Sequence, residues 1–166
     1  MKKLAILFIV VLFNSCSIAF NGASIPDEMK TVNVPFFENN APLVIPDMAN
    51  KFTEEFKTRI RNQTRLSITN NNADATFSGN ITGYDIRPVA IQDNNQPTAG
   101  ANRMTIRVSV KYTNNLNPKL SFEESFERFK DFKLNGASLQ AVEPGYIRDV
   151  TLQLTEDIFN RAFANW

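Results

Sequence analysis

The chain has 166 residues, with 18 basic and 17 acidic side chains, 14 phenylalanines, one cysteine and no histidine. This length matches one ordinary domain, and the net charge of +1 removes the electrostatic case for general nucleic-acid binding. Because histidine, the most common catalytic base, is absent, the composition favours a protein that is not an enzyme.

The first sixteen residues have the pattern of a lipoprotein signal. Lys2 and Lys3 precede ten unbroken apolar residues, LAILFIVVLF. A helix that spans a bilayer needs roughly 20 such residues, whereas a shorter run is typical of a secretory signal peptide. Ser15, a small residue directly before the lone cysteine, predicts a signal peptide over 1–15 and lipidation of Cys16. The alternative interpretation is a buried strand that ends in a core cysteine.

Cleavage before Cys16 leaves one domain over 16–166, with 16 basic residues against 17 acidic ones. Its first predicted strand, Thr31 to Phe37, alternates apolar and polar residues. Pro35 lacks an N–H donor and indicates an edge position or the end of regular pairing. A helix is predicted from Asp47 to Thr64, where apolar residues recur every four positions at Met48, Phe52, Phe56 and Ile60.

Two strands and a long connection are predicted in the middle of the chain. Thr76 to Ile86 reads as a strand whose two glycines, Gly79 and Gly83, indicate a bulge or a close approach. Pro88 to Asn102 reads as a long, mobile hairpin connection. The strand from Arg103 to Thr113 alternates cleanly, with apolar side chains on one face.

The polar face of that strand carries a row of three cations, Arg103, Arg107 and Lys111. One interpretation of this row is a solvated or partner-facing sheet surface.

The last third of the chain contains one ambiguous segment and one clear helix. Lys119 to Phe132 fits a helix or a strand, and its aromatic content after a hairpin favours a strand with a bulge. Tyr146 to Trp166 predicts a helix with a wide apolar arc. The order β-α-β-β-β-α predicts a single α+β domain, with about four strands in a mainly antiparallel sheet and two amphipathic helices packed on it.

Motifs for metal or cofactor binding are missing from the sequence. The acidic residues lack calcium-loop spacing, and Gly79-x-x-x-Gly83 lacks the lysine of a phosphate-binding loop. We therefore expect no metal and no cofactor. A hydrolase with a Ser–Lys pair stays open as an alternative, although no motif places the pair.

Three groups of residues stand in an order that resembles a known family. The first is Cys16 followed by Phe20-x-Gly22 and Ile25-Pro26-x-x-Met29-Lys30-Thr31. The second is Glu38-Asn39-x-Ala41-Pro42-Leu43, before the helix that ends in Gln63-Thr64-Arg65-Leu66. The third is Glu156-Asp157-Ile158-Phe159-Asn160-x-Ala162-Phe163-x-Asn165-Trp166. Together they resemble the LPS-assembly lipoprotein family (LptE), the lipoprotein subunit of the outer-membrane lipopolysaccharide translocon.

The resemblance implies a non-enzymatic lipoprotein that inserts into the LptD β-barrel, assists its folding and plugs it while lipopolysaccharide passes to the cell surface. It also implies direct contact with lipopolysaccharide. Because an anionic glycolipid suits cations beside apolar surface, the candidate ligand-binding residues are Arg103, Arg107 and Lys111. Ser17, where many inner-membrane lipoproteins have aspartate, favours the outer membrane. The absence of an acidic run after Cys16 favours a periplasm-facing domain on the inner leaflet. A lipid- or glycan-binding surface lipoprotein is the alternative function.

Overall fold

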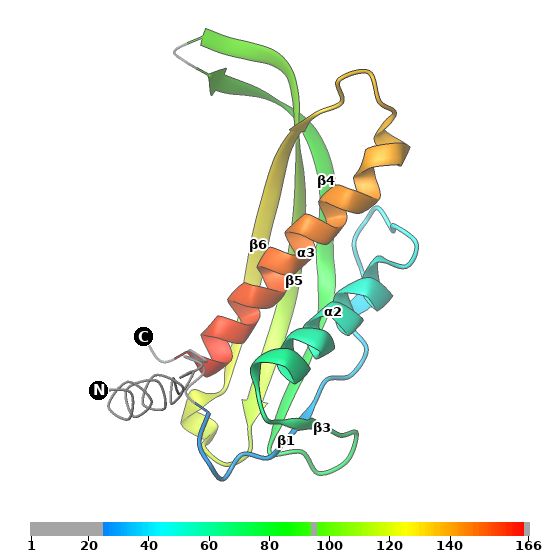
Figure 1. Cartoon of the computed structure of the whole chain (residues 1–166). Helices are drawn as coiled ribbons and strands as arrows, with labels where there is room; N and C mark the ends of the chain where they lie inside the picture. The colour runs from blue at the N-terminus through cyan, green and yellow to red at the C-terminus, as the bar shows by residue number, and fades with distance from the viewer. Residues whose placement is uncertain (1–24, 94–95, 165–166) are drawn as a thin grey trace, which may run out of the picture.

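The computed structural model of the chain describes residues 25–93 and 96–164 (Figure 1). The expected signal peptide 1–15, Cys16 and Trp166 lie outside these residues. The two helices are α2 (Met48–Gln63) and α3 (Leu139–Phe163). A short 3-10 helix, η1, covers Pro118–Leu120. The strands are β1 (Thr31–Asn33), β2 (Glu38–Asn39), β3 (Ser67–Ile68), β4 (Ala75–Asp93), β5 (Gln96–Asn114) and β6 (Phe122–Lys133).

The described strands form one mixed sheet in the order β3-β1-β4-β5-β6, with β2 beside β4. The three long strands β4, β5 and β6 pair antiparallel, as expected. The short strands β1, β2 and β3 pair in parallel, and α2 forms the crossover between β1 and β3. The α+β class and the two helices are confirmed. The sheet has six strands where about four were expected, because two of the strands are only two residues long.

Helices α2 and α3 lie side by side on one face of the sheet, and within residues 25–93 and 96–164 the other face carries no helix (Figure 1). The layers meet in an aromatic core. The ring of Phe77 on β4 lies 4.9 Å from that of Phe56 on α2, 4.6 Å from Tyr112 on β5 and 5.7 Å from Phe163 on α3. Each of these four side chains is almost fully buried. The abundance of phenylalanine thus reflects the core, and aromatic pairs stabilise it beyond the area they bury.

The first strand ends at a proline, as the sequence predicts. Pairing of β1 stops at Asn33, two residues before Pro35, and β2 resumes at Glu38. The carboxylate of Asp74 holds β1 beside β4, because it accepts hydrogen bonds from the N–H groups of Lys30 and Thr31 at 2.8 and 2.9 Å. These bonds lower the pKa of Asp74 below its ordinary value.

A bulge in β4 changes which residues face the helices. The register with β5 shifts between Ile81 and Gly83. Without the shift, Tyr84 would lie on the polar face with Thr82; with it, Tyr84 is 4% exposed and joins the core. Its hydroxyl donates to Glu143 on α3 at 2.5 Å. The bulge expected in the segment 119–132 is absent, since β6 pairs with β5 in continuous register.

The connection expected over Pro88 to Asn102 is instead a continuation of the β4–β5 hairpin. Pairs run from Pro88 opposite Asn102 to Asp93 opposite Gln96, and the ribbon projects beyond the rest of the sheet (Figure 1). The strands β1 and β2 pair with β4 only as far as Ile81. Beyond Ile81, the edge of β4 away from β5 is therefore open. Pro88 is tolerated in β4 because its missing N–H can face this open edge.

Helix α3 begins at Leu139, seven residues before the expected start at Tyr146. Pro144 therefore lies inside the helix. Packing outweighs the local cost of the proline: Tyr146 stacks on Phe132 of β6 with ring centroids 4.4 Å apart, and Leu139 packs against the core.

Ion pairs fix the edges of both helices. Along α3, Asp157 pairs with Arg128 and Arg161 with Glu124, both on β6. On α2, Lys51 pairs with Asp47, and the guanidinium of Arg59 donates to the Leu152 carbonyl of α3 at 2.9 Å.

Among the described residues, no helix is both long enough and apolar enough to cross a bilayer.

The tightest backbone approach in the sheet gives a test of the fold. A Cβ atom at Gly79 would lie 2.1 Å from the carbonyl oxygen of Ser109 and 2.9 Å from the Phe37 ring. We expect Gly79→Ala to lower the free energy of unfolding by about 1–3 kcal/mol, because β5 or the core must shift. Chemical denaturation followed by circular dichroism measures this change.

The matched control is Gly145→Ala, because a Cβ at Gly145 in α3 meets no atom within 4 Å. This variant is expected to keep or slightly raise stability, since alanine favours a helix over glycine by up to about 1 kcal/mol. Equal stability of the two variants would contradict the packing described for Gly79.

Candidate functional site

The sheet face that carries no helix presents the three basic residues singled out in the sequence. Arg103, Arg107 and Lys111 lie on one face of β5, with the apolar side chains of the strand buried on the other. On β6, an acidic residue stands directly opposite each of them: Asp131, Glu127 and Glu123 respectively. The spacing of four residues on both strands makes a ladder of opposite charges. We call these six residues the charge ladder.

Guanidinium groups in the ladder are already bound to carboxylates. Arg103 donates to both oxygens of Asp131, with its Nε at 2.7 Å and its Nη2 at 2.8 Å. Its guanidinium carbon also lies 3.9 Å from the centre of the Phe129 ring. Arg107 pairs with Glu127, and its Nη1 donates to Asp85 of β4 at 3.1 Å. An anionic ligand would therefore compete with two or three carboxylates for these cations.

The pairing with Arg103 changes the acidity of Asp131. Hydrogen bonds from the Arg103 guanidinium lower the pKa of Asp131 below its ordinary value, so the pair is fully charged at neutral pH. Lys111 differs from the two arginines, because among the described residues no carboxylate lies within ion-pair distance of its ammonium group. The face as a whole is polar and close to electrically neutral.

Sequence reasoning found the basic half of the ladder and missed the acidic half. Glu123, Glu127 and Asp131 have the same four-residue spacing as Arg103, Arg107 and Lys111. Pairing the two segments as an antiparallel hairpin would have placed the acids opposite the bases. This pattern was missed because residues 119–132 fitted a helix as well as a strand. The side of the sheet on which Asp85 lies could not be predicted, because it depends on the bulge in β4.

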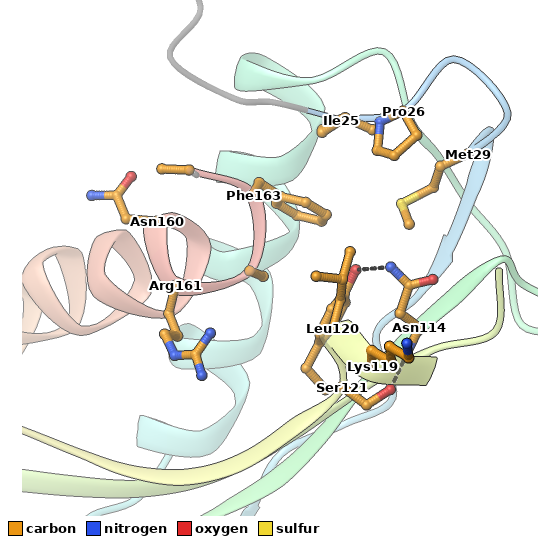
Figure 2. A pocket seen from close by; sticks show the side chains of 13 residues that line it. Ile25, Pro26, Met29, Asn114, Lys119, Leu120, Ser121, Asn160, Arg161 and Phe163 are labelled. Carbon is orange, nitrogen blue, oxygen red and sulfur yellow. Dashed lines mark hydrogen bonds between the residues drawn. The ribbon is translucent and has the colours of Figure 1, made fainter. Parts of the chain in front are cut away.

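A pocket of about 540 Å³ lies at one end of the molecule (Figure 2). Its walls come from three segments that are distant in the sequence: Ile25 and its neighbours, the β5–β6 connection and the last turn of α3. In Figure 2, Leu120 and Phe163 extend toward the hollow from two of these segments, and Ile25 bounds the third side. Tyr112 and Phe163 belong to the aromatic core, so the pocket opens directly onto it.

A second pocket, of about 490 Å³, lies between the N-terminal halves of α2 and α3. Its lining is mainly apolar, with Met48 and Ile147 among its walls. Glu143 also lines it and accepts a hydrogen bond from the hydroxyl of Tyr84. Burial and this hydrogen bond raise the pKa of Tyr84 well above its ordinary value of 10.0, so the hydroxyl stays protonated.

Metal-ligating side chains do not gather within residues 25–93 and 96–164, where no group of three acids, histidines or cysteines is close enough to hold an ion. The expected lipidation site, Cys16, lies outside these ranges. The structure thus places three predicted ligand-binding residues on one face and offers two pockets that the sequence did not indicate.

Comparison with solved structures identifies the fold in other bacterial proteins. A minor lipoprotein from Acinetobacter baumannii is 10% identical, with a TM-score of 0.51 over 80% of this chain and 91% of that one. The protein CT253 from Chlamydia trachomatis is 12% identical, with a TM-score of 0.56 over 80% and 94%. A homolog of the neuraminyllactose-binding hemagglutinin from Helicobacter pylori is 10% identical, with a TM-score of 0.51 over 83% and 85%.

At these identities the structural likeness establishes the fold alone. No curated protein is significantly similar to the chain in sequence. The match that identifies a family is to LptE, described as lipopolysaccharide-assembly, and it extends over residues 29–162. That match includes both helices of the structure except the last residue of α3, and all six strands. The chain therefore belongs to the LptE family of lipopolysaccharide-assembly proteins.

Proposed function

We propose that the chain is a non-enzymatic outer-membrane lipoprotein that plugs an LptD-type β-barrel and assists its assembly in lipopolysaccharide transport. Family membership supports a role in lipopolysaccharide assembly. The observation that carries the finer proposal is the sheet face opposite the helices, which is long and polar and whose arginines are paired with carboxylates.

A plug in a barrel must match the chemistry of the barrel wall. The interior of a large outer-membrane barrel is polar, so a plug needs a polar surface whose charges are already satisfied. The charge ladder meets this requirement: its arginines are paired, and small side chains such as Ser109 and Ser125 stand opposite one another between the charged pairs. We assign this face to the barrel.

Lipidation of Cys16 places the domain on the periplasmic side of the outer membrane, on its inner leaflet. Two or three acyl chains make such attachment stable, whereas one chain alone is marginal. This anchor brings the domain to the membrane in which the barrel folds.

Direct contact with lipopolysaccharide is proposed at Arg103, Arg107 and Lys111. Lys111 is exposed and faces no carboxylate within ion-pair distance among the described residues. Arg103 and Arg107 contribute only where phosphate groups of the ligand displace Asp131 and Glu127, since a guanidinium binds either anion through the same donors.

A lipid- or glycan-binding surface lipoprotein is the second candidate. Its support is the fold shared with the hemagglutinin homolog from Helicobacter pylori. The two candidates differ in exposure: a surface lipoprotein is digested by protease on intact cells, while a plug on the periplasmic side is protected until the outer membrane is opened.

The anchor and the barrel partner are tested together by extraction. We expect the native chain to float with outer-membrane vesicles and to co-purify with a large β-barrel protein in mild detergent. Cys16→Ala is expected to move the domain into the soluble fraction, because the acyl chains provide the attachment. Unchanged membrane attachment of the variant would refute lipidation, and a native chain that purifies alone would refute the barrel partner.

Docking through the sheet is tested by adding bulk at Ser125, an exposed residue at the centre of the charge ladder. We expect Ser125→Trp to reduce the amount of barrel that co-purifies, because the new ring prevents close approach of the lumen wall. Leu152→Trp is the matched control, since Leu152 is exposed on α3 on the helix side of the sheet. If only Leu152→Trp reduces the amount of barrel that co-purifies, the barrel contacts the helix side of the domain and not the charge ladder.

Ligand contact is tested with charge variants in the ladder and purified lipopolysaccharide. Arg103→Glu, Arg107→Glu and Lys111→Glu, combined in one chain, are expected to weaken binding about tenfold or more, as the loss of charge-assisted hydrogen bonds requires. Glu127→Gln with Asp131→Asn is expected to strengthen binding, because it removes the carboxylate partner of Arg103 and leaves Arg107 with Asp85 alone. Binding is measured by calorimetry. Unchanged affinity in both variants would show that this face does not bind lipopolysaccharide, and contact with the barrel would be its only proposed role.

A further inference from the structure

We propose that the β5–β6 connection, residues 115–121, is a lipid-contact turn that inserts its two leucines into the leaflet that holds the acyl chains of Cys16. The inference rests on the lipid anchor in the proposed function and goes beyond it, because it assigns a second membrane contact to the folded domain itself.

The turn exposes apolar side chains without any structural need to do so. Leu116 is 49% exposed and Leu120 is 44% exposed, two of the seven large apolar side chains that the described surface displays. They stand four residues apart on the same connection. Transfer of such side chains from water into hydrocarbon is favourable in proportion to the apolar surface removed from water.

Internal hydrogen bonds make this turn rigid. The buried side-chain oxygen of Asn114 accepts the N–H groups of Leu116 and Asn117 at 3.0 and 2.8 Å. The hydroxyl of Ser121 accepts the N–H of Asn114 at 3.0 Å, which closes the connection on itself. The leucines are therefore presented in a fixed geometry, and contact with lipid requires little further ordering of the backbone.

The turn lies beside the point where the anchored segment enters the domain. Ile25 is the first described residue, and it lines the same pocket as Leu120 (Figure 2). Residues 17–24 connect Ile25 to Cys16, and an extended chain of this length reaches at most about 30 Å. The apolar wall of the pocket, formed with Phe163 and Ala162, is continuous with Leu120.

The charges around the turn suit a phospholipid surface. Lys119 stands between the two leucines and is exposed, so its ammonium group can reach a lipid phosphate while its stem lies along apolar surface. Arg161 at the pocket is bound to Glu124, with its Nη2 at 2.6 Å from a carboxylate oxygen, and Asp27 on the far side is bound to Arg65. Glu124 and Asp27 are thus each paired with an arginine of the domain.

The test uses the full lipidated chain in vesicles of phosphatidylethanolamine and phosphatidylglycerol, some of whose acyl chains carry bromine as a quencher. Leu116→Trp and Leu120→Trp place a fluorescent ring on the turn, and both positions are exposed enough to accept it. Leu43→Trp is the control, since Leu43 is 55% exposed in the connection before α2, away from the pocket. The unsubstituted chain, with Trp166 as its single tryptophan, gives the background emission.

We expect brominated lipid to reduce the emission of the tryptophans placed at 116 and 120 and to leave that of the tryptophan at 43 unchanged. Protein that floats with the vesicles but shows no quenching at 116 and 120 would overturn the inference and leave the anchor intact. A chain that fails to float would instead overturn the anchor, and with it this inference. Blue-shifted emission without bromine quenching would show that protein covers the turn, which also overturns it.

Discussion

The packing of Phe77 is the contact on which the other features of the molecule depend. Its ring touches aromatic residues from α2, β5 and α3, so a single side chain joins both helices to the sheet. Because these contacts all lie on one face, the helices are held together there and the opposite face is left for the charge ladder. Its contact with Phe163 also fixes the end of α3 beside the β5–β6 connection, which creates the pocket at that end.

The bulge between Ile81 and Gly83 determines which chemistry appears on each face. Beyond it, Tyr84 turns inward to reach Glu143, and Asp85 turns outward, where it accepts hydrogen bonds from Arg107. Without the extra residue, the carboxylate of Asp85 would lie beneath α3 with no cation opposite it, and burial of an unpaired charge is expensive. One irregularity of the backbone thus completes both the core and the charge ladder.

Most of the elements could be predicted from local pattern, and the failures share one physical cause. The alternation of β5 and the four-residue repeat of α2 depend on burial on one face, which the sequence records directly. The start of α3 at Leu139 and the continued hairpin after Pro88 depend on contacts with distant segments, namely Phe132 on β6 and the paired backbone of β5. Likewise, the acids of the ladder pair with the arginines only because of the register between β5 and β6, and the sequence of one strand alone does not determine that register. The pockets could not be predicted, because each combines segments that are far apart in the sequence.

The surface has two parts that suit different media. The charge ladder is polar and electrically neutral, whereas Leu116 and Leu120 are apolar and exposed. Paired charges cost little to place against a polar wall, since each guanidinium keeps its carboxylate there, but they would be costly against hydrocarbon. Leu116 and Leu120 have the opposite preference, because water is the medium in which they are least stable. The charge ladder lies on β5 and β6, and the leucines lie on the connection that joins these two strands, next to the last pair, Tyr112 opposite Phe122. A domain whose strands run from a polar face to an apolar turn is therefore suited to the boundary between a barrel and the lipid around it.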